Sequence, residues 1–296
     1  MASIYRLATV SLLLSLPFFF TPSMAALVEQ QPLELKYHNG VLLKGNVTVN
    51  LIWYGSFTPA QRSIIVDFVE SLSSPGAPLP SVASWWSTTE KYEGGASNLV
   101  VGRQILHENY PLGKSLKNSH LIGLCSGPNP MNSTNVVLTS PDVAVEGFCM
   151  RCGSHGSAGR KARFTYIWVG NSVVQCPGQC AWPFHQPIYG PQTPPLLSPN
   201  GDVGVDGMII NLATLLAGTV TNPYQDGYFQ GPANAPLEAV SACTGMFGSG
   251  AYSGYPGRVL TDKVTGASYN ANGVKGRKFL LPAMWDPKTS ACSTLV

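Results

Sequence analysis

The sequence predicts a mixed α/β (α+β) fold, in which a sheet carries flanking helices and the C-terminal part is rich in loops. Three observations lead to this prediction. A strand pattern at 47–54 is followed at once by a helix pattern at 59–72, and apolar strand-like runs recur further along the chain. The chain after residue 221 is rich in turn-forming residues, most densely at 245–257.

The clearest local signal is the strand–turn–helix pattern at its start. Apolar residues at every second position from 47 to 53 indicate a strand with one buried face. Thr58 stands where a helix N-cap belongs, Pro59 occupies the first helical position, and Gln61 can complete a capping box. Apolar residues at helical spacing over 64–72 then extend the helix.

The other elements follow from similar patterns. We expect further strands at 99–106, 135–146 and 163–169, and further helices at 80–91 and 205–220. Either Asp202 or Asp206 can cap the last of these helices. The proline-rich segment 183–199 can form neither a helix nor an inner strand, so it is an ordered loop or a boundary.

Residues 1–25 have the features of a cleavable export signal. Arg6 supplies a positive charge, residues 7–20 form an apolar run, and 23–25 provide a site of small residues for cleavage. Pro17 interrupts the run, which is shorter than the roughly 20 residues that a spanning helix needs. We therefore expect one mature domain at 26–296 that is secreted to the extracellular space and is not embedded in a membrane.

The composition narrows the choice of partners. Charged residues make up 11% of the chain, well below the roughly 25% of an average globular protein, and the net charge is +3. Because lysine and arginine form no run or stripe, the sequence indicates no nucleic-acid partner.

An odd number of cysteines in an exported chain favours three disulfides and one remaining thiol. The seven candidates are Cys125, Cys149, Cys152, Cys176, Cys180, Cys243 and Cys292. Sequence alone leaves their connectivity open. The spacing of Cys149, Cys152, Cys176 and Cys180 also matches a four-thiolate zinc site, but an oxidising compartment favours disulfides over this alternative.

Two sequons are candidate glycosylation sites in a secreted chain. They begin at Asn46 and Asn132.

The motifs of familiar enzyme classes are missing. No serine has the Gly-x-Ser-x-Gly context of a hydrolase elbow, and the glycine-rich stretch 245–257 lacks the Gly-Lys-Ser/Thr of a phosphate loop. His107 and Glu108 form the one His-Glu pair, but Pro111 prevents the helix that a zinc protease needs. The sequence therefore predicts no catalytic residue, resident metal or cofactor.

Some side chains are nevertheless candidates for a functional site. His155 is a candidate site residue, because it lies beside the cysteine cluster in a segment, 152–157, that we expect to be a flexible loop. Carboxylates for glycan hydrolysis could come from Glu146, Asp202, Asp206, Asp226 and Glu238. Trp85, Trp86, Trp182 and Trp285 could stack on sugar rings, although buried core positions are the more common place for tryptophan.

Several segments together resemble the plant EXORDIUM family, also called phosphate-induced proteins. They are Lys36–Leu43, Val47–Gly55, Ser81–Trp86, Cys152–Ser157, Cys176–Phe184, Pro199–Asp206 and Cys243–Gly248. The resemblance covers nearly all of the expected mature chain. It implies an apoplastic or cell-wall protein that promotes or regulates growth in brassinosteroid-responsive cell expansion, and it implies no reaction.

A second, shorter resemblance concerns 211–223. This segment is similar to the active helix of zinc-protease-like proteins that carry Ser-His-Glu-Leu-Ala-Glu before a Thr-Asp-Pro turn. The metal-binding histidine falls on Thr214, the catalytic glutamate on Leu215 and a second acidic position on Gly218. None of these side chains can do that work, so a zincin-like fold here would lack its metal site.

These observations favour a secreted protein that acts by binding a wall component, a receptor or a peptide. The alternative is an apoplastic hydrolase of wall glycan or peptide, acting through a carboxylate pair or His155. A deep pocket lined by two carboxylates about 5–10 Å apart would favour the hydrolase. A shallow surface of aromatic and amide groups would favour binding.

Overall fold

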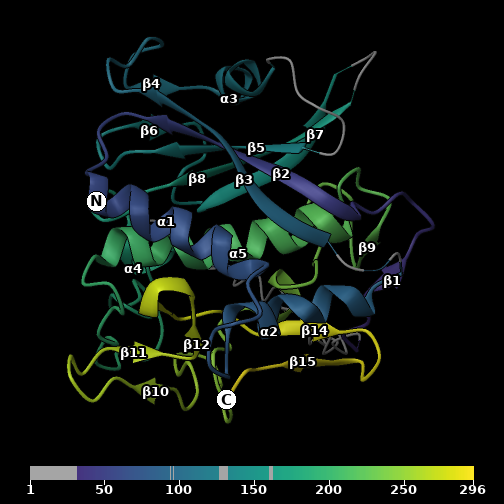
Figure 1. Ribbon diagram of the computed structural model, residues 1–296, viewed down its shortest axis with the longest axis vertical. Coiled ribbons are helices and arrows are strands. Elements are labelled where there is room, and N and C mark those ends of the chain that lie inside the picture. The colour runs from purple at the N-terminus through teal and green to yellow at the C-terminus, as the bar shows by residue number, and fades with distance from the viewer. Residues whose placement is uncertain (1–31, 94, 96, 127–132, 160–162) are drawn as a thin grey trace, which may run out of the picture. The chain divides into compact units, whose positions relative to one another are not determined.

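A five-stranded sheet forms the centre of the fold (Figure 1). The strand order is β3-β2-β5-β8-β7, with β2 (Gly45–Tyr54), β3 (Ser97–His107), β5 (Ser133–Thr139), β7 (Gly153–Ala158) and β8 (Phe164–Gly170). The first four strands are parallel, and β7 pairs antiparallel with β8 at one edge. The computed structural model describes residues 32–93, 95, 97–126, 133–159 and 163–296, so the expected export signal and Asn132 lie outside the described residues.

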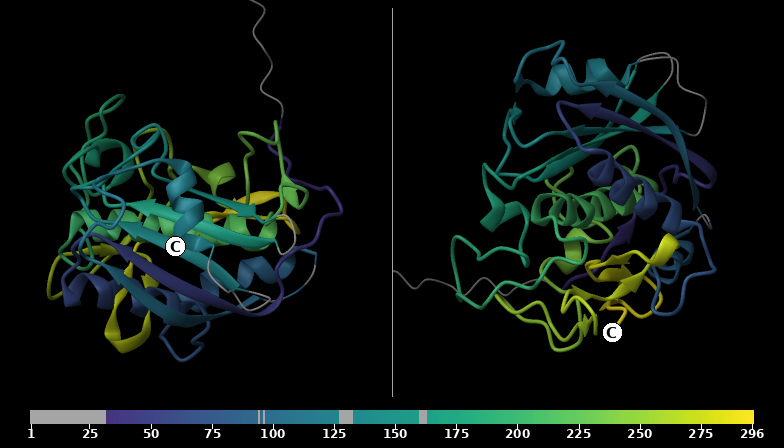
Figure 2. Two further views of the ribbon diagram at one scale, coloured as in Figure 1. Left: turned by 90° about the horizontal axis from the view of Figure 1, so that it is seen from above. Right: turned by 60° about the vertical axis from the view of Figure 1, so that its left-hand side comes forward.

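Helices cover both faces of this sheet, as parallel strands require (Figures 1 and 2). Helices α1 (Pro59–Leu72) and α5 (Val203–Thr221) pack on one face, and α3 (Asn118–Cys125) packs on the other. In strand β2, successive side chains point to opposite faces of the sheet. Its Leu51 and Trp53 join the core beneath α1 and α5, whereas Ile52 and Tyr54 join the smaller core beneath α3.

The caps of the two long helices are linked to each other. The predicted capping box of α1 is confirmed, because Thr58 Oγ1 accepts from the N–H of Gln61 and Gln61 Oε1 accepts from the N–H of Thr58. Asp202 is the N-cap of α5, where its Oδ1 accepts from the N–H of Val205 at 2.9 Å. The other oxygen of Asp202 accepts from Gln61 Nε2 at 2.9 Å, which joins the starts of both helices.

The remaining elements are short. The C-terminal hairpins lie beyond the helix layer, on the side away from the sheet (Figures 1 and 2). The remaining helices are α2 (Val82–Trp86), η1 (Ser87–Lys91), α4 (Pro177–Cys180), η2 (Ser241–Cys243) and η3 (Val274–Gly276), and the remaining strands are β1 (Lys36–Tyr37), β4 (Ser115–Leu116), β6 (Ala144–Val145), β9 (Tyr228–Phe229), β10 (Leu260–Thr261), β11 (Ser268–Tyr269), β12 (Ala271–Asn272), β13 (Lys278–Phe279), β14 (Met284–Asp286) and β15 (Ala291–Ser293).

Three expectations need correction. The helix expected at 80–91 is α2 followed by the 3-10 turn η1, and the strand expected at 135–146 ends at Thr139, before the separate strand β6. The segment 152–157, expected as a flexible loop, mostly forms β7. Its glycines and serines carry no strand pattern, so pairing with β8 creates this strand.

The prediction of three disulfides and one thiol is confirmed. Cys149 pairs with Cys176, Cys152 with Cys180, and Cys243 with Cys292. The first two disulfides contain all four cysteines of the alternative zinc site. None of these cysteines therefore has a thiolate that could bind zinc. Cys125 keeps its thiol in the core beneath α3, where burial raises its pKa to about 12.

Within the described residues, α5 is the one helix that is long and apolar enough to cross a membrane. However, 78% of its apolar window is buried inside the protein. It is the central core helix, packed between the sheet and the C-terminal part (Figure 2).

Candidate functional site

The candidate residue His155 forms a pair with Glu238. His155 lies on β7 and Glu238 precedes η2, and His155 Nε2 is 2.7 Å from Glu238 Oε2. The other carboxylate oxygen accepts from Nδ2 of Asn222, the C-cap residue of α5, at 2.7 Å. Each side chain of the His155–Glu238 pair is 12% exposed. The pair therefore connects β7, the end of α5 and the segment before η2.

Gly218 of α5 makes room for this pair. A Cβ at this position would lie 2.7 Å from Glu238 Oε2 and 2.9 Å from His155 Nε2. Gly218 is the position that the zinc-protease resemblance assigns to an acidic residue, so the helix here contacts a histidine and a carboxylate from other elements. No group of three or more His, Cys, Asp or Glu that could hold a metal occurs in the described part of the chain.

A histidine held by a carboxylate is a common part of acid–base machinery. Here, however, neither residue lines the two cavities described below. Nδ1 of His155 is buried and has no hydrogen-bond partner among the described residues. The pair stabilises the packing of β7 against α5 and presents no group to a ligand in either cavity.

Replacing Glu238 by Ala is expected to lower the free energy of unfolding by about 2–3 kcal/mol, because the variant leaves His155 and Asn222 without their shared acceptor. Urea denaturation measures this change. Glu238→Gln is the matched control, since its amide oxygen can still accept one hydrogen bond, and it is expected to lose less. Equal losses in the two variants would show that the hydrogen bonds contribute little.

The other carboxylate candidates do not gather into a catalytic pair. Asp202 caps α5, and Glu146 accepts from the N–H of Asn118 at the start of α3. The carboxyl group of Asp226 lies against Gly40, away from the other candidates. Asp206 is 2% exposed, and its two oxygens accept from the backbone and side-chain nitrogens of Asn200.

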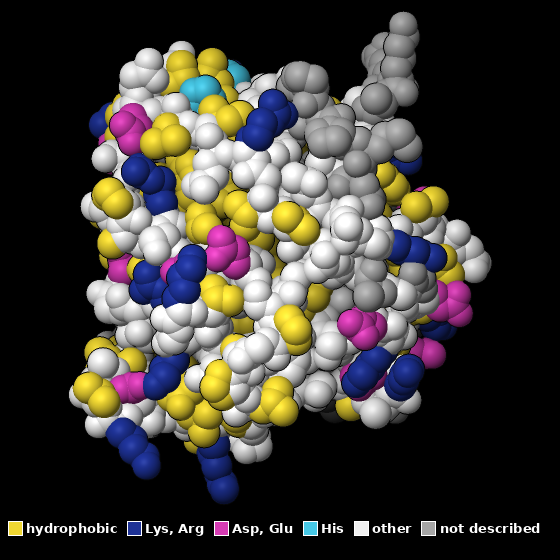
Figure 3. Space-filling view, in the orientation of Figure 1, with side chains coloured by type: hydrophobic (Ala, Val, Ile, Leu, Met, Phe, Trp, Pro, Cys, Tyr) yellow, Lys and Arg dark blue, Asp and Glu magenta, His cyan; other side chains and the backbone are white. Residues whose placement is uncertain are grey.

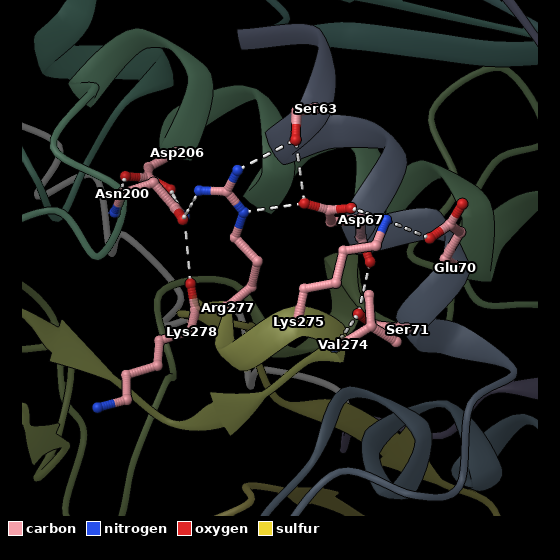
Figure 4. Close-up of polar contacts among 10 residues, drawn as sticks. All are labelled: Ser63, Asp67, Glu70, Ser71, Asn200, Asp206, Val274, Lys275, Arg277 and Lys278. Carbon is pink, nitrogen blue, oxygen red and sulfur yellow. Dashed lines mark hydrogen bonds and ion pairs between the residues drawn. The ribbon is translucent and has the colours of Figure 1, made fainter. Parts of the chain in front are cut away.

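A charged cleft of about 740 Å³ lies among α1, the loop before α5 and the segment around η3 (Figure 4). Asp67 of α1 lines the cleft, and its oxygens accept from Lys275 Nζ at 2.7 Å and Arg277 Nε at 3.0 Å. Burial by itself raises the pKa of Asp67, but the hydrogen bonds from Lys275, Arg277 and Ser63 outweigh it and hold the pKa below its usual value. Asp67 is therefore ionised and neutralised by its neighbours.

The second carboxylate of the charged cleft, Asp262, is paired in the same way with Lys278. On the face shown in Figure 3, basic and acidic side chains are likewise interspersed. Asp206 lies behind Asn200, which lines the cleft, and burial raises the pKa of Asp206 to about 7. A proton donor at this position cannot reach a substrate in the cleft. The arrangement does not meet the requirement for a glycosidase, which is two accessible carboxylates free to act as acid and base.

A second cavity, the aromatic pocket, has a volume of about 410 Å³. Three aromatic side chains and several glycines and prolines line it. The lining residues are Trp182, Pro187, Tyr189, Gly190, Pro191, Thr244, Gly245, Met246, Tyr252, Ser253 and Gly254. None of them carries a charge, a carboxylate or an amide side chain. The side chains thus offer ring faces and a few hydroxyl groups to a neutral ligand.

Disulfides hold two walls of the aromatic pocket. Trp182 follows Cys180, which is bonded to Cys152, and Thr244 follows Cys243, which is bonded to Cys292. Such cross-links restrict the motion of the two walls that they join, which lowers the entropy lost when a ligand binds there.

Gly254 allows the hairpin that forms the third wall of the aromatic pocket to pack closely against the proline-rich loop. Tyr252 and Tyr255 exchange two backbone hydrogen bonds in a tight hairpin, and Gly254 within it has φ of 86°. A Cβ on Gly254 would lie 2.8 Å from the ring of Pro191, so a larger residue would push the hairpin away from the proline-rich loop. Thr193 Oγ1 donates to the carbonyl of Gly254 at 3.1 Å and fixes the same contact.

The sequence analysis identified only one residue of the aromatic pocket as a candidate. Trp182 was a candidate for stacking, and the structure places it at the pocket, whereas Trp85, Trp86 and Trp285 are buried in the main core. Tyr189 and Tyr252, 83% and 67% exposed, were missed. A tyrosine inside a proline-rich or glycine-rich loop is the signal that could have found them, because such loops bury little and leave large rings exposed.

The fold and these surfaces define a disulfide-braced α/β protein with a neutral aromatic pocket and a charged cleft in which both carboxylates are paired. The chain belongs to the phosphate-induced protein family, since the phosphate-induced protein 1 conserved region matches residues 35–295. This confirms the resemblance to the EXORDIUM family that the sequence segments indicated.

Several plant relatives match along nearly their whole length. The chain is 68% identical to EXORDIUM-like 2 of Arabidopsis thaliana over 309 residues, covering 100% of both chains. It is 58% identical to PHOSPHATE-INDUCED 1 of Nicotiana tabacum, covering 94% of each, and 58% identical to EXORDIUM of Arabidopsis thaliana, covering 91% of this chain and 93% of that protein. No solved structure matches the chain.

Proposed function

We propose that the protein is secreted to the plant cell wall, where it regulates growth and cell expansion by binding a wall component in the aromatic pocket. Membership of the EXORDIUM family supports the role in growth. We include in the proposal a response to brassinosteroid, which the resemblance of the sequence segments implies. Three disulfides and the apolar N-terminal segment support export, because disulfides persist in oxidising compartments. Asn46, which is exposed at the start of β2, is a proposed glycan site.

The observation that carries the binding role is the composition of the aromatic pocket. Exposed rings on a disulfide-held frame give affinity at little cost in conformational entropy. Meanwhile, the carboxylates of the charged cleft are already occupied by lysine and arginine side chains. Binding is therefore favoured over hydrolysis.

The test uses full-length protein recovered from the medium of plant cells that express it. Insoluble wall material is mixed with this protein, and the bound fraction is measured by co-sedimentation. Replacing Tyr189 or Tyr252 by Ala is expected to weaken wall binding about tenfold, because each change removes an exposed ring at the pocket. Thermal unfolding of these variants is expected to stay close to that of the unchanged protein.

Met150 provides the matched control. It is an exposed apolar side chain that does not line the aromatic pocket, so Met150→Ala should leave wall binding unchanged. Three results would count against the proposal: absence of the protein from the medium, wall binding that does not depend on Tyr189 and Tyr252, or release of soluble sugar or peptide from the wall. The last would favour the hydrolase alternative, particularly if His155→Gln abolished it.

A further inference from the structure

We infer that Tyr252 and Tyr255 form a site of oxidative modification, at which a peroxidase and hydrogen peroxide join the two phenol rings into an intramolecular dityrosine. The inference goes beyond the proposed function, because it concerns a covalent change in the hairpin and not the ligand of the aromatic pocket. Three observations carry it: the spacing of the two rings, their exposure, and the burial of the other tyrosine pairs.

The hairpin holds the two tyrosines opposite each other. The N–H of Tyr252 donates to the carbonyl of Tyr255 at 3.0 Å, and the N–H of Tyr255 donates back to the carbonyl of Tyr252 at 2.8 Å. Residues that exchange both backbone hydrogen bonds lie directly opposite, with their side chains on the same face of the hairpin. The ring centroids of Tyr252 and Tyr255 are accordingly 5.0 Å apart, and the rings are tilted by 37°.

The arrangement of the two rings is favourable for coupling. Two phenol rings joined by a single carbon–carbon bond also lie next to each other, with a twist between their planes. Exposed side chains change rotamer within nanoseconds, so rotation about the side-chain bonds can bring the ortho carbons of the two rings together. Two groups held close in this way react far more readily than the same groups free in dilute solution.

An oxidant can reach this pair more easily than any other pair of tyrosine rings in the described part of the chain. Tyr252 is 67% exposed and Tyr255 is partly exposed. The other tyrosine pairs in contact there are Tyr37–Tyr228, Tyr54–Tyr110 and Tyr92–Tyr228. Each of them contains a buried ring, and burial raises the pKa of the hydroxyl of that ring, at Tyr54, Tyr92 or Tyr228. Because coupling requires the hydroxyl to release its proton, burial disfavours the reaction in those pairs.

The reaction balances with hydrogen peroxide as the oxidant. Each phenol gives up one electron and its hydroxyl proton, and together these reduce one hydrogen peroxide to two waters. The new bond joins a carbon ortho to one hydroxyl with a carbon ortho to the other, and the hydrogens on those carbons move to the oxygens and restore both hydroxyls. The protein therefore loses two hydrogen atoms and gains one carbon–carbon bond.

The test treats dilute, purified full-length protein with a haem peroxidase and hydrogen peroxide. Dityrosine fluorescence and the loss of two hydrogen atoms from the intact mass are expected, and peptide mass spectrometry should place the new bond between Tyr252 and Tyr255. The yield should not depend on protein concentration, because both rings belong to one molecule. Tyr252→Phe and Tyr255→Phe keep the rings but lack one hydroxyl, so each should lose the product.

Tyr189→Phe is the matched control. It removes a phenol that is 83% exposed but has no ring partner among the described residues, so this variant should keep the product. Product that persists in both Tyr252→Phe and Tyr255→Phe would overturn the inference, and so would covalent dimers formed in place of the intramolecular product. Wall binding is measured without peroxide, so the proposed function stands or falls separately from this result.

Discussion

Replacing Asp206 by Asn is expected to remove a loss of up to about 4 kcal/mol in the free energy of unfolding that the unchanged protein shows between pH 4 and pH 8. The carboxyl group is 2% exposed in the first turn of α5. Burial raises its pKa from 3.8 to about 7, although hydrogen bonds from Asn200 and Ser198 act in the opposite direction. The ionised form is therefore unfavourable in the folded protein.

The direction of the pH effect follows from proton binding. Below a pH of about 4, Asp206 is protonated in both the folded and the unfolded chain, so its contribution to stability is fully present. Between about 4 and 7 the unfolded chain loses this proton first, and the free energy of unfolding falls as pH rises. Above a pH of about 7, the free energy of unfolding stays lower by the full amount. An asparagine cannot ionise, so the variant avoids this loss.

Urea denaturation at pH 4 and pH 8 checks this expectation, with Asp67→Asn as the contrasting variant. The lowered pKa of Asp67 means that its ionised form favours the folded state, and this stabilisation is lost as pH falls through the folded pKa. Removing the charge of Asp67 should therefore weaken the protein at pH 8, whereas removing the charge of Asp206 relieves a loss of stability that develops between pH 4 and pH 8. A pH dependence that Asp206→Asn does not alter would contradict the assignment.

The parts of the fold that sequence could predict are those determined by neighbouring residues. Helix α1 begins and ends where the capping box and apolar spacing indicated, because Thr58, Pro59 and Gln61 act within one turn. The apolar segment expected at 205–220 forms α5 for the same reason, with Asp202 as its cap. Both signals are local, so they need no knowledge of the tertiary structure.

The parts that sequence could not predict depend on contacts between distant residues. Strand β7 contains no apolar pattern and exists because β8 pairs with it. His155 and Glu238 are 83 residues apart, and only the packing of β7 against α5 brings them together. Likewise, the aromatic pocket combines two loops that read separately as a proline-rich connection and a run of turns. Side chains that share a surface in this way leave no spacing to detect.

The cysteines combine a feature that sequence could predict with one that it could not. Their odd number and the expected export were enough to predict three disulfides and one thiol. Their partners could not be chosen, because Cys149 and Cys152 are close enough in sequence to exchange roles with each other. Helix α4 resolves the choice by placing Cys176 and Cys180 one turn apart, opposite the start of β7.

Removing the Cys243–Cys292 disulfide is expected to have a large effect on stability, comparable to that of Asp206→Asn. Changing both residues to Ser should lower the free energy of unfolding by about 4 kcal/mol, because the bridge closes a loop of 49 residues in the unfolded chain. Removing the Cys149–Cys176 bridge in the same way should cost about 2–3 kcal/mol. The neighbouring Cys152–Cys180 bridge still holds those two segments together, so only a short loop is released.

The two double variants form a matched pair, since each removes one bridge and adds two serines. Urea denaturation under non-reducing conditions measures their stability, and a greater loss in Cys149→Ser/Cys176→Ser than in Cys243→Ser/Cys292→Ser would contradict the loop-length argument. The second variant should also bind wall material more weakly under conditions where it remains folded. Cys243 immediately precedes the wall of the aromatic pocket formed by Thr244, Gly245 and Met246, so its release allows that wall to move and adds an entropy loss to every binding event.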